Sequence, residues 1–157
     1  MGTARGVQLT RDGKARLEDE LRHLREERLP ELSERIQEAT SEGDVSDNSE
    51  YEDLKEEYNR LESRVLDLET ILERATIIEE GSADGIIRIG SHVTVRTPDE
   101  SEDEHWVMVS PEEAHAPEGR ISSDSPVGRM LLGSRAGDAI TVTTPGGEIV
   151  YTVVDVK

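Results

Sequence analysis

The stretch Gly43-Asp-Val-Ser-Asp-Asn-Ser-Glu-Tyr51 separates two long, charged and amphipathic segments. The first runs roughly from Thr10 to Glu42, and the second runs from Asp47 to Ala75. Glycine and short polar residues between two amphipathic runs favour a turn within one chain. The sequence therefore predicts an antiparallel coiled-coil hairpin whose turn carries carboxylates. The structural alternative is a dimeric coiled coil; because the loop argues against it, we expect a monomer.

The first amphipathic segment has one break in its helical pattern. Thr10 is expected to cap the helix, and leucines follow in three- and four-residue steps as far as Leu24. The next apolar residue is Leu29, and Pro30 follows it directly. An interior proline removes a backbone hydrogen bond and clashes with the preceding turn. We therefore expect a kink or a stagger near Arg28–Pro30, with the helix continuing beyond it.

The second segment has an unbroken heptad pattern, which predicts one long helix. At about 1.5 Å per residue, this helix should be on the order of 45 Å long. Charged residues occupy its other positions, as on a solvated helix surface. The apolar positions are Tyr51, Leu54, Tyr58, Leu61, Val65, Leu68, Leu72 and Ala75.

The C-terminal half has the short β-branched runs of a small α+β domain. A glycine-dependent turn at Thr144–Gly147 predicts a hairpin, and Ser125 with Pro126 predicts the start of a short helix. We expect an α+β chain with a helical domain at residues 1–78 and a second domain at residues 79–157. The expected strands are His92–Arg96, Trp106–Val109, Ala139–Thr143 and Glu148–Val154.

Composition excludes several classes of function. The 157 residues include no cysteine, so disulfides and thiolate metal sites are absent. The net charge of −18 is shared by both halves and opposes autonomous binding of nucleic acid. The four histidines lack metal-ligand spacing. Without a long apolar run or a secretory signal, the sequence predicts a cytoplasmic protein with no membrane partner.

The turn between the two helices carries the chemistry that the sequence offers. Asp44 and Asp47 are three residues apart, and two carboxylates suit Mg2+, which is often held by one or two carboxylates plus substrate phosphates. Alternatively, Asp47 and Glu50 resemble a capping box of the second helix, and Asp44 is a turn residue. Spacing alone leaves both interpretations open. Tyr51 occupies an apolar position, which favours a packing role.

Four motifs in order resemble the bacterial Gre family of transcript cleavage factors, in its GreA-like branch. The segment at residues 43–51 is similar to the family's tip motif, and Val7–Thr10 is similar to its opening. The segments at residues 119–133 and 144–148 resemble its C-terminal signature and closing hairpin. The resemblance covers nearly the whole chain.

The resemblance implies a coiled-coil hairpin followed by a domain of FKBP-like fold. That domain would dock at the secondary channel of RNA polymerase, while the hairpin reaches the polymerase active centre. Asp44 and Asp47 would help to hold a Mg2+ shared with the polymerase, supported by Asn48, Glu50 and Tyr51. The polymerase would cleave the 3′ end of backtracked RNA, which the chain meets only within the complex. The chain itself is then not an enzyme, and no cofactor is stably bound.

Three further expectations follow from the comparison with the family pattern. Asp124, Ser125 and Pro126 match the segment that contacts the polymerase, and helix capping is the alternative role. Asp47 stands where the family usually has glutamate, which shortens the side chain by one methylene. This departure motivates an alternative function, a channel-binding regulator that inhibits the polymerase. A third hypothesis is a plain coiled-coil assembly protein.

Overall fold

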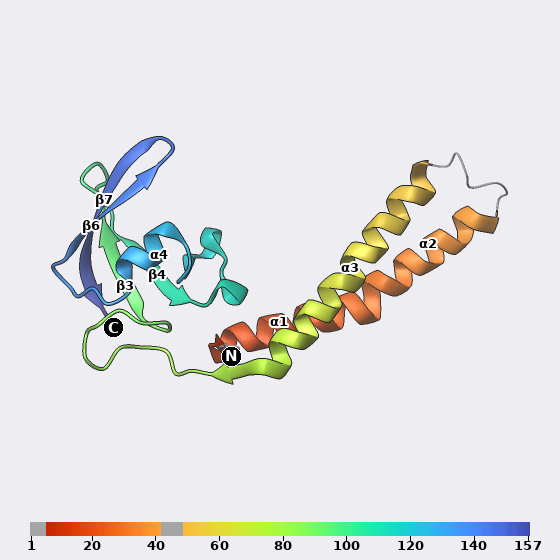
Figure 1. Ribbon diagram of the computed structural model, residues 1–157, viewed down its shortest axis with the longest axis horizontal. Coiled ribbons are helices and arrows are strands. Elements are labelled where there is room, and N and C mark those ends of the chain that lie inside the picture. Colours follow the sequence, from red (N-terminus) through yellow and green to blue (C-terminus); the bar gives the residue numbers. More distant parts are fainter. Residues whose placement is uncertain (1–5, 42–48) are drawn as a thin grey trace, which may run out of the picture. The chain divides into compact units, whose positions relative to one another are not determined.

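The computed structural model describes residues 6–41 and 49–157, which form two compact units (Figure 1). The helical hairpin spans Lys14–Arg74. The sheet unit combines residues 6–13 with Ala75–Lys157, so the chain leaves this unit and returns to it. Helices and sheet are segregated along the chain, which confirms the predicted α+β class.

The helical segments form the two sides of the hairpin, and the first side contains one irregular turn. They are α1 (Arg11–His23), η1 (Leu24–Arg28), α2 (Leu29–Ser41) and α3 (Ser49–Arg74). The turn η1 is π-helical, and the N–H of Leu29 donates to the carbonyl of Leu24, five residues back. This turn accounts for the five-residue step between the two leucines. The continuation of the helix beyond Pro30 is confirmed, and the irregularity is a π-helical turn that ends at Arg28, where the kink or stagger was expected to begin.

A narrow apolar seam holds the two sides of the hairpin together. Leu32 and Leu68 are completely inaccessible to solvent. Burying a leucine side chain contributes about 1.5–3 kcal/mol, so a few such residues supply most of the stability of this unit. Tyr51 and Leu61, at other predicted seam positions, are only half-buried, as expected for two helices without a third layer. The buried seam residues are Leu17, Leu24, Leu32, Leu54, Val65 and Leu68.

Ion pairs flank the seam; apart from Arg25–Glu69, those named here run in opposite order along the two sides, as an antiparallel hairpin requires. Arg64 donates to both oxygens of Glu20, at 2.7 and 3.0 Å. This hydrogen bond raises the pKa of Arg64 above its ordinary value. Half-exposed pairs of this kind contribute little to stability, so they set register rather than hold the hairpin. The other pairs between the two sides are Arg25–Glu69, Arg28–Glu57 and Arg35–Glu50.

The prediction that the second helix extends to Ala75 is wrong by one residue. Helix α3 ends at Arg74, and Ala75 begins the strand β2 (Ala75–Ile77). Strand β2 pairs in parallel with β1 (Val7–Leu9), which precedes α1. The β-branched residues Thr76 and Ile77 favour this extended conformation, and the heptad pattern alone did not reveal the change.

The sheet unit contains a five-stranded sheet in the order β5-β4-β3-β7-β6. All neighbours are antiparallel except β4 and β5. The elements are β3 (His92–Arg96), β4 (Glu104–Val109), η2 (Pro111–Glu113), η3 (Ala116–Glu118), β5 (Arg120–Ser122), α4 (Pro126–Leu131), β6 (Ala139–Thr144) and β7 (Gly147–Val156).

The core of the sheet unit lies on one face of this sheet. Trp106 packs edge-on against Tyr151, with ring centroids 5.2 Å apart, beside the buried cluster. The four predicted strands, the hairpin turn and the short helix after Ser125 are confirmed, whereas β5 was not predicted. The buried cluster consists of Ile87, Val93, Val95, Met108, Leu131, Ile140, Val142 and Val153.

Leu68→Ala is expected to lower the free energy of unfolding by about 2–5 kcal/mol, because truncation leaves a cavity in the seam. Urea unfolding followed by far-UV circular dichroism measures the loss. Leu66 lies on the same helix but is 60% exposed, so Leu66→Ala is a matched control. The control should stay within about 0.5 kcal/mol of the wild type. Equal losses in both variants would contradict the assignment of the seam.

Candidate functional site

Of the two predicted site segments, the one between α2 and α3 lies largely outside the described residues, and the one at the start of α4 lies within them. Asp44, Asp47 and Asn48 lie outside the described residues, so their roles remain predictions. The segment at residues 42–48 joins α2 to α3, and these two helices are antiparallel within the hairpin. The described ends of α2 and α3 therefore agree with the predicted hairpin, in which a short acidic segment connects two antiparallel helices.

Glu50 and Tyr51 form the beginning of α3, next to that segment. The side chain of Glu50 is 70% exposed, and its Oε1 lies 3.9 Å from Nη2 of Arg35 on α2. Tyr51 is half-buried, and Nζ of Lys55 lies 5.3 Å from the centroid of its ring. The contact of Glu50 joins α3 to α2, whereas that of Tyr51 lies within α3, and the supporting roles of both residues stay predictions. These contacts do not test a capping box that includes Asp47.

Within the described residues, no group of three or more histidine, aspartate or glutamate side chains is arranged to bind a metal ion. The predicted Mg2+ ligands Asp44 and Asp47 lie outside the described residues, so this donor set stays a prediction from the sequence, with oxygen ligands of the type that Mg2+ prefers. Two protein ligands leave most of the octahedral shell of the ion to other groups.

The second predicted segment begins α4 and is fully described. Oγ of Ser125 accepts a hydrogen bond of 3.0 Å from the N–H of Gly128, and Pro126 occupies the first turn. The same hydroxyl donates to the carbonyl of Ser122 at 2.7 Å. Ser125 is thus the helix cap, as the alternative role predicted. Asp124 and Pro126 remain exposed on either side of it and are free to contact a partner.

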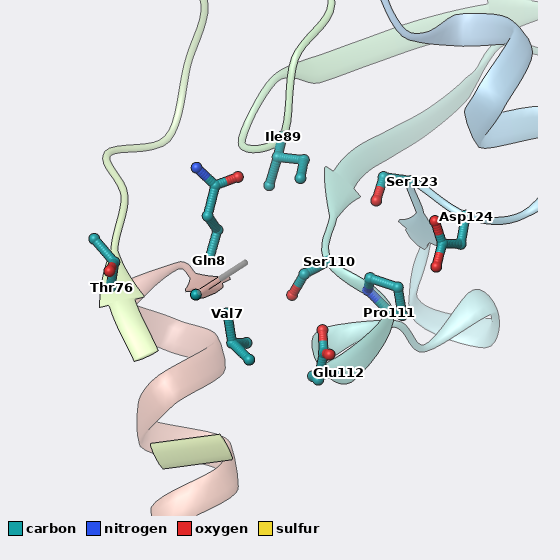
Figure 2. A pocket seen from close by; sticks show the side chains of 10 residues that line it. Val7, Gln8, Thr76, Ile89, Ser110, Pro111, Glu112, Ser123 and Asp124 are labelled. Atoms are coloured by element: carbon teal, nitrogen blue, oxygen red, sulfur yellow. The ribbon is translucent and has the colours of Figure 1, made fainter. Parts of the chain in front are cut away.

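Asp124 also lines a groove of about 660 Å³ in the sheet unit (Figure 2). Val7 and Gln8 of β1 lie on one side of the groove, while Ser110 and Asp124 lie on the other. Sequence reasoning assigned no role of their own to Gln8, which was noted only within the Val7–Thr10 motif, or to Ser110, because only the fold brings them to the groove beside Asp124.

Exposed apolar side chains adjoin the same segment. Met130 on α4 is 48% exposed, and Leu132 directly after the helix is 39% exposed. Methionine is enriched at protein interfaces, and the rims of interfaces are polar and solvent-accessible. Asp124, Pro126, Met130 and Leu132 are thus all exposed within one short stretch of chain, and the predicted contact of this segment with a partner stays a prediction.

Two family models match the chain, one over each half. The model described as "Transcription elongation factor, N-terminal" matches residues 7–77. The model described as "Transcription elongation factor, GreA/GreB, C-term" matches residues 82–157. The chain belongs to the GreA/GreB family of transcription elongation factors. The resemblance inferred from the sequence motifs is confirmed.

Individual members of the family are similar over nearly their whole length. Transcription elongation factor GreA of Roseiflexus sp. (strain RS-1) is 46% identical over 150 residues, which cover 95% of this chain and 96% of that protein. GreA of Bacillus cereus is 39% identical over 158 residues and covers both chains fully. Among solved structures, Thermus thermophilus Gfh1 is 40% identical and covers 98% of this chain and 99% of its own, with a TM-score of 0.46.

Members of the GreA/GreB family are transcription elongation factors and are not themselves enzymes. None of the described helices has the length and apolar character needed to cross a membrane.

Ser125→Ala is expected to lower the free energy of unfolding of the sheet unit by about 1 kcal/mol, because the N–H of Gly128 loses its acceptor. Chemical denaturation followed by the fluorescence of Trp106 measures this change. Ser123→Ala is the matched control, since Ser123 does not take part in the cap. If the two variants are equally stable, the capping role is not supported.

Proposed function

We propose that this chain binds RNA polymerase and stimulates cleavage of the 3′ end of backtracked RNA by the polymerase's own active centre. The observation that carries the proposal is the acidic segment at residues 42–48, which joins the helices of a hairpin in a chain of the GreA/GreB family. Cleavage would leave a new 3′ end that the polymerase can extend, so arrested complexes would be rescued.

The chain's own contribution at the reacting centre is a pair of carboxylates. Asp44 and Asp47 would supply oxygen ligands to a Mg2+ that is shared with the polymerase. When bound, such an ion lowers the pKa of a water molecule and offsets negative charge on a phosphoryl oxygen. The two aspartates complete a site rather than form one, which fits a factor with no stably bound cofactor.

Docking is assigned to the surface around Asp124 and Pro126 in the sheet unit. Its exposed carboxylate and its neighbouring apolar side chains, Met130 and Leu132, support contact with protein. The chain would act as a monomer in the bacterial cytoplasm and meet RNA only within the polymerase complex. Its net charge of −18 opposes binding to free nucleic acid.

A second candidate function is a regulator that binds at the same channel and slows the polymerase without cleavage. The observation that favours it is Asp47, because the shorter side chain reaches less far than the glutamate usual in the family. The two functions differ in one measurable product, which is shortened RNA.

Asp44→Asn is expected to reduce stimulated cleavage on the order of 100-fold, because the amide keeps the shape but loses the negative oxygen ligand. The assay follows the length of labelled RNA in stalled, backtracked polymerase complexes over a range of factor concentrations. The factor concentration that gives half the maximal rate should be unchanged.

Asp53→Asn is the control for Asp44→Asn, since it removes an exposed carboxylate from α3 of the same hairpin. Equal cleavage by the wild type and Asp44→Asn would refute the role of the tip. Slower RNA synthesis without shortened RNA, already in the wild type, would favour the second candidate function.

Asp124→Ala is expected to raise the half-maximal factor concentration about tenfold, which corresponds to about 1.4 kcal/mol of binding free energy. The rate at saturating factor should not change, because the tip is intact. Asp99→Ala removes an exposed carboxylate elsewhere in the sheet unit and serves as the control. An unchanged concentration dependence for Asp124→Ala would place the docking surface elsewhere.

A further inference from the structure

A buried polar cluster surrounds the first turn of α1. Thr10 is completely buried, and Glu113 and Arg120 are 7% and 8% exposed. The three residues are brought together from distant parts of the chain, since Glu113 ends η2 and Arg120 begins β5. All three belong to the sheet unit, whereas α1 continues from Gly13 into the helical hairpin without interruption.

The hydroxyl of Thr10 is the centre of this cluster. It accepts hydrogen bonds from the N–H of Gly13 at 3.0 Å and from Nη2 of Arg120 at 3.2 Å, and it donates to Oε1 of Glu113. One donor and two acceptor positions are the full capacity of a hydroxyl group. The N–H of Thr10 donates to the other oxygen of Glu113 at 3.0 Å. The predicted helix cap is thus confirmed, and it is tied to two residues of the sheet unit.

The carboxylate of Glu113 is held from both sides. Arg120 forms an ion pair with it, and a second guanidinium nitrogen of Arg120 lies 3.4 Å from Oδ2 of Asp12. Gly13 leaves the space that this carboxylate occupies, because a Cβ atom at that position would overlap it. The helix therefore begins directly on the ion pair, without an apolar layer between them.

The energetics of such a cluster favour a geometric role over a stabilising one. Removing two charges from water costs several kcal/mol per ion, and well-packed apolar residues are often as stable or more stable in their place. Adjacent Leu9 is fully buried and already supplies apolar contact at the start of the helix. Hydrogen bonds have a preferred direction at each donor and acceptor, and apolar contacts have none.

We propose that Thr10, Glu113 and Arg120 are positioning residues, which fix the first turn of α1 on the sheet unit so that a docked factor presents its tip productively. This inference rests on the proposed function, since it assigns one unit to docking and the other to delivery of the tip. A displacement of about 1 Å at a reacting centre can cost about 100-fold in rate, so loose attachment of the helix would reduce cleavage without preventing docking.

The first test replaces Thr10 by valine, which has the same shape without the hydroxyl, and by serine, which retains it. Cleavage by stalled polymerase complexes is measured over a range of factor concentrations. Thr10→Val should lower the maximal rate about 10- to 100-fold and leave the half-maximal concentration within about twofold. Thr10→Ser should restore the maximal rate. An unchanged maximal rate for Thr10→Val would overturn the inference.

The second test measures how firmly the first turn of α1 is attached to the sheet unit, and it does not depend on cleavage activity. The chain has no cysteine, so Glu34→Cys on α2 and Glu148→Cys on β7, both at exposed positions, accept a pair of spin labels. Pulsed electron paramagnetic resonance then gives the distribution of distances between the two labels. The distribution should be narrow in the otherwise wild-type chain, broad with Thr10→Val and narrow with Thr10→Ser. A distribution that is broad from the start, or unaffected by Thr10→Val, would overturn the inference.

A second variant guards against loss of folding. Glu113→Gln keeps the shape of the side chain and one acceptor, and Glu112→Gln, an exposed neighbour, is its matched control. If circular dichroism shows that Thr10→Val is unfolded, Glu113→Gln replaces it with the same expectations. If the wild type cleaves no RNA, the proposed function fails, while the label distances still decide whether the cluster holds the helix.

Discussion

The parallel pairing of β1 with β2 is the constraint on which the rest of the chain depends. Val7 pairs with Ala75 and Leu9 pairs with Ile77, so the two ends of the helical hairpin are joined side by side in the sheet unit. Parallel strands cannot be joined by a tight turn and need a long connection, and here the helical hairpin is that connection. The apolar seam then selects one antiparallel register of the two helices. The acidic segment follows as the connection between them.

Local sequence predicted those elements whose signal lies within the element itself. The heptad pattern gave α3 within two residues at its start and one at its end, and the five-residue step from Leu24 to Leu29 marked the π-helical turn. Ser125 and Thr10 were recognised as caps because the cap is a property of the residue and its next three neighbours.

Elements that depend on distant partners were not predictable in the same way. Strands β1, β2 and β5 have three residues each, which is too short for an alternating pattern to stand out. No sequence pattern links Glu113 and Arg120 to Thr10, and only the fold brings the three residues together. The groove beside Asp124 is formed in the same way, since β1 and the segment after β4 meet only through tertiary structure.

The strong negative charge and the proposed role at an RNA 3′ end are compatible for an electrostatic reason. Carboxylates and phosphates repel each other, and this repulsion acts over about 8–10 Å at physiological salt, so the free factor has little affinity for RNA. A divalent cation between the two groups reverses the sign of the interaction at short range. Acidic residues at the tip are therefore attracted to RNA only where a cation is already held beside it. Under the proposed function, the charge that prevents binding to free RNA is the charge that makes the tip specific for the polymerase active centre.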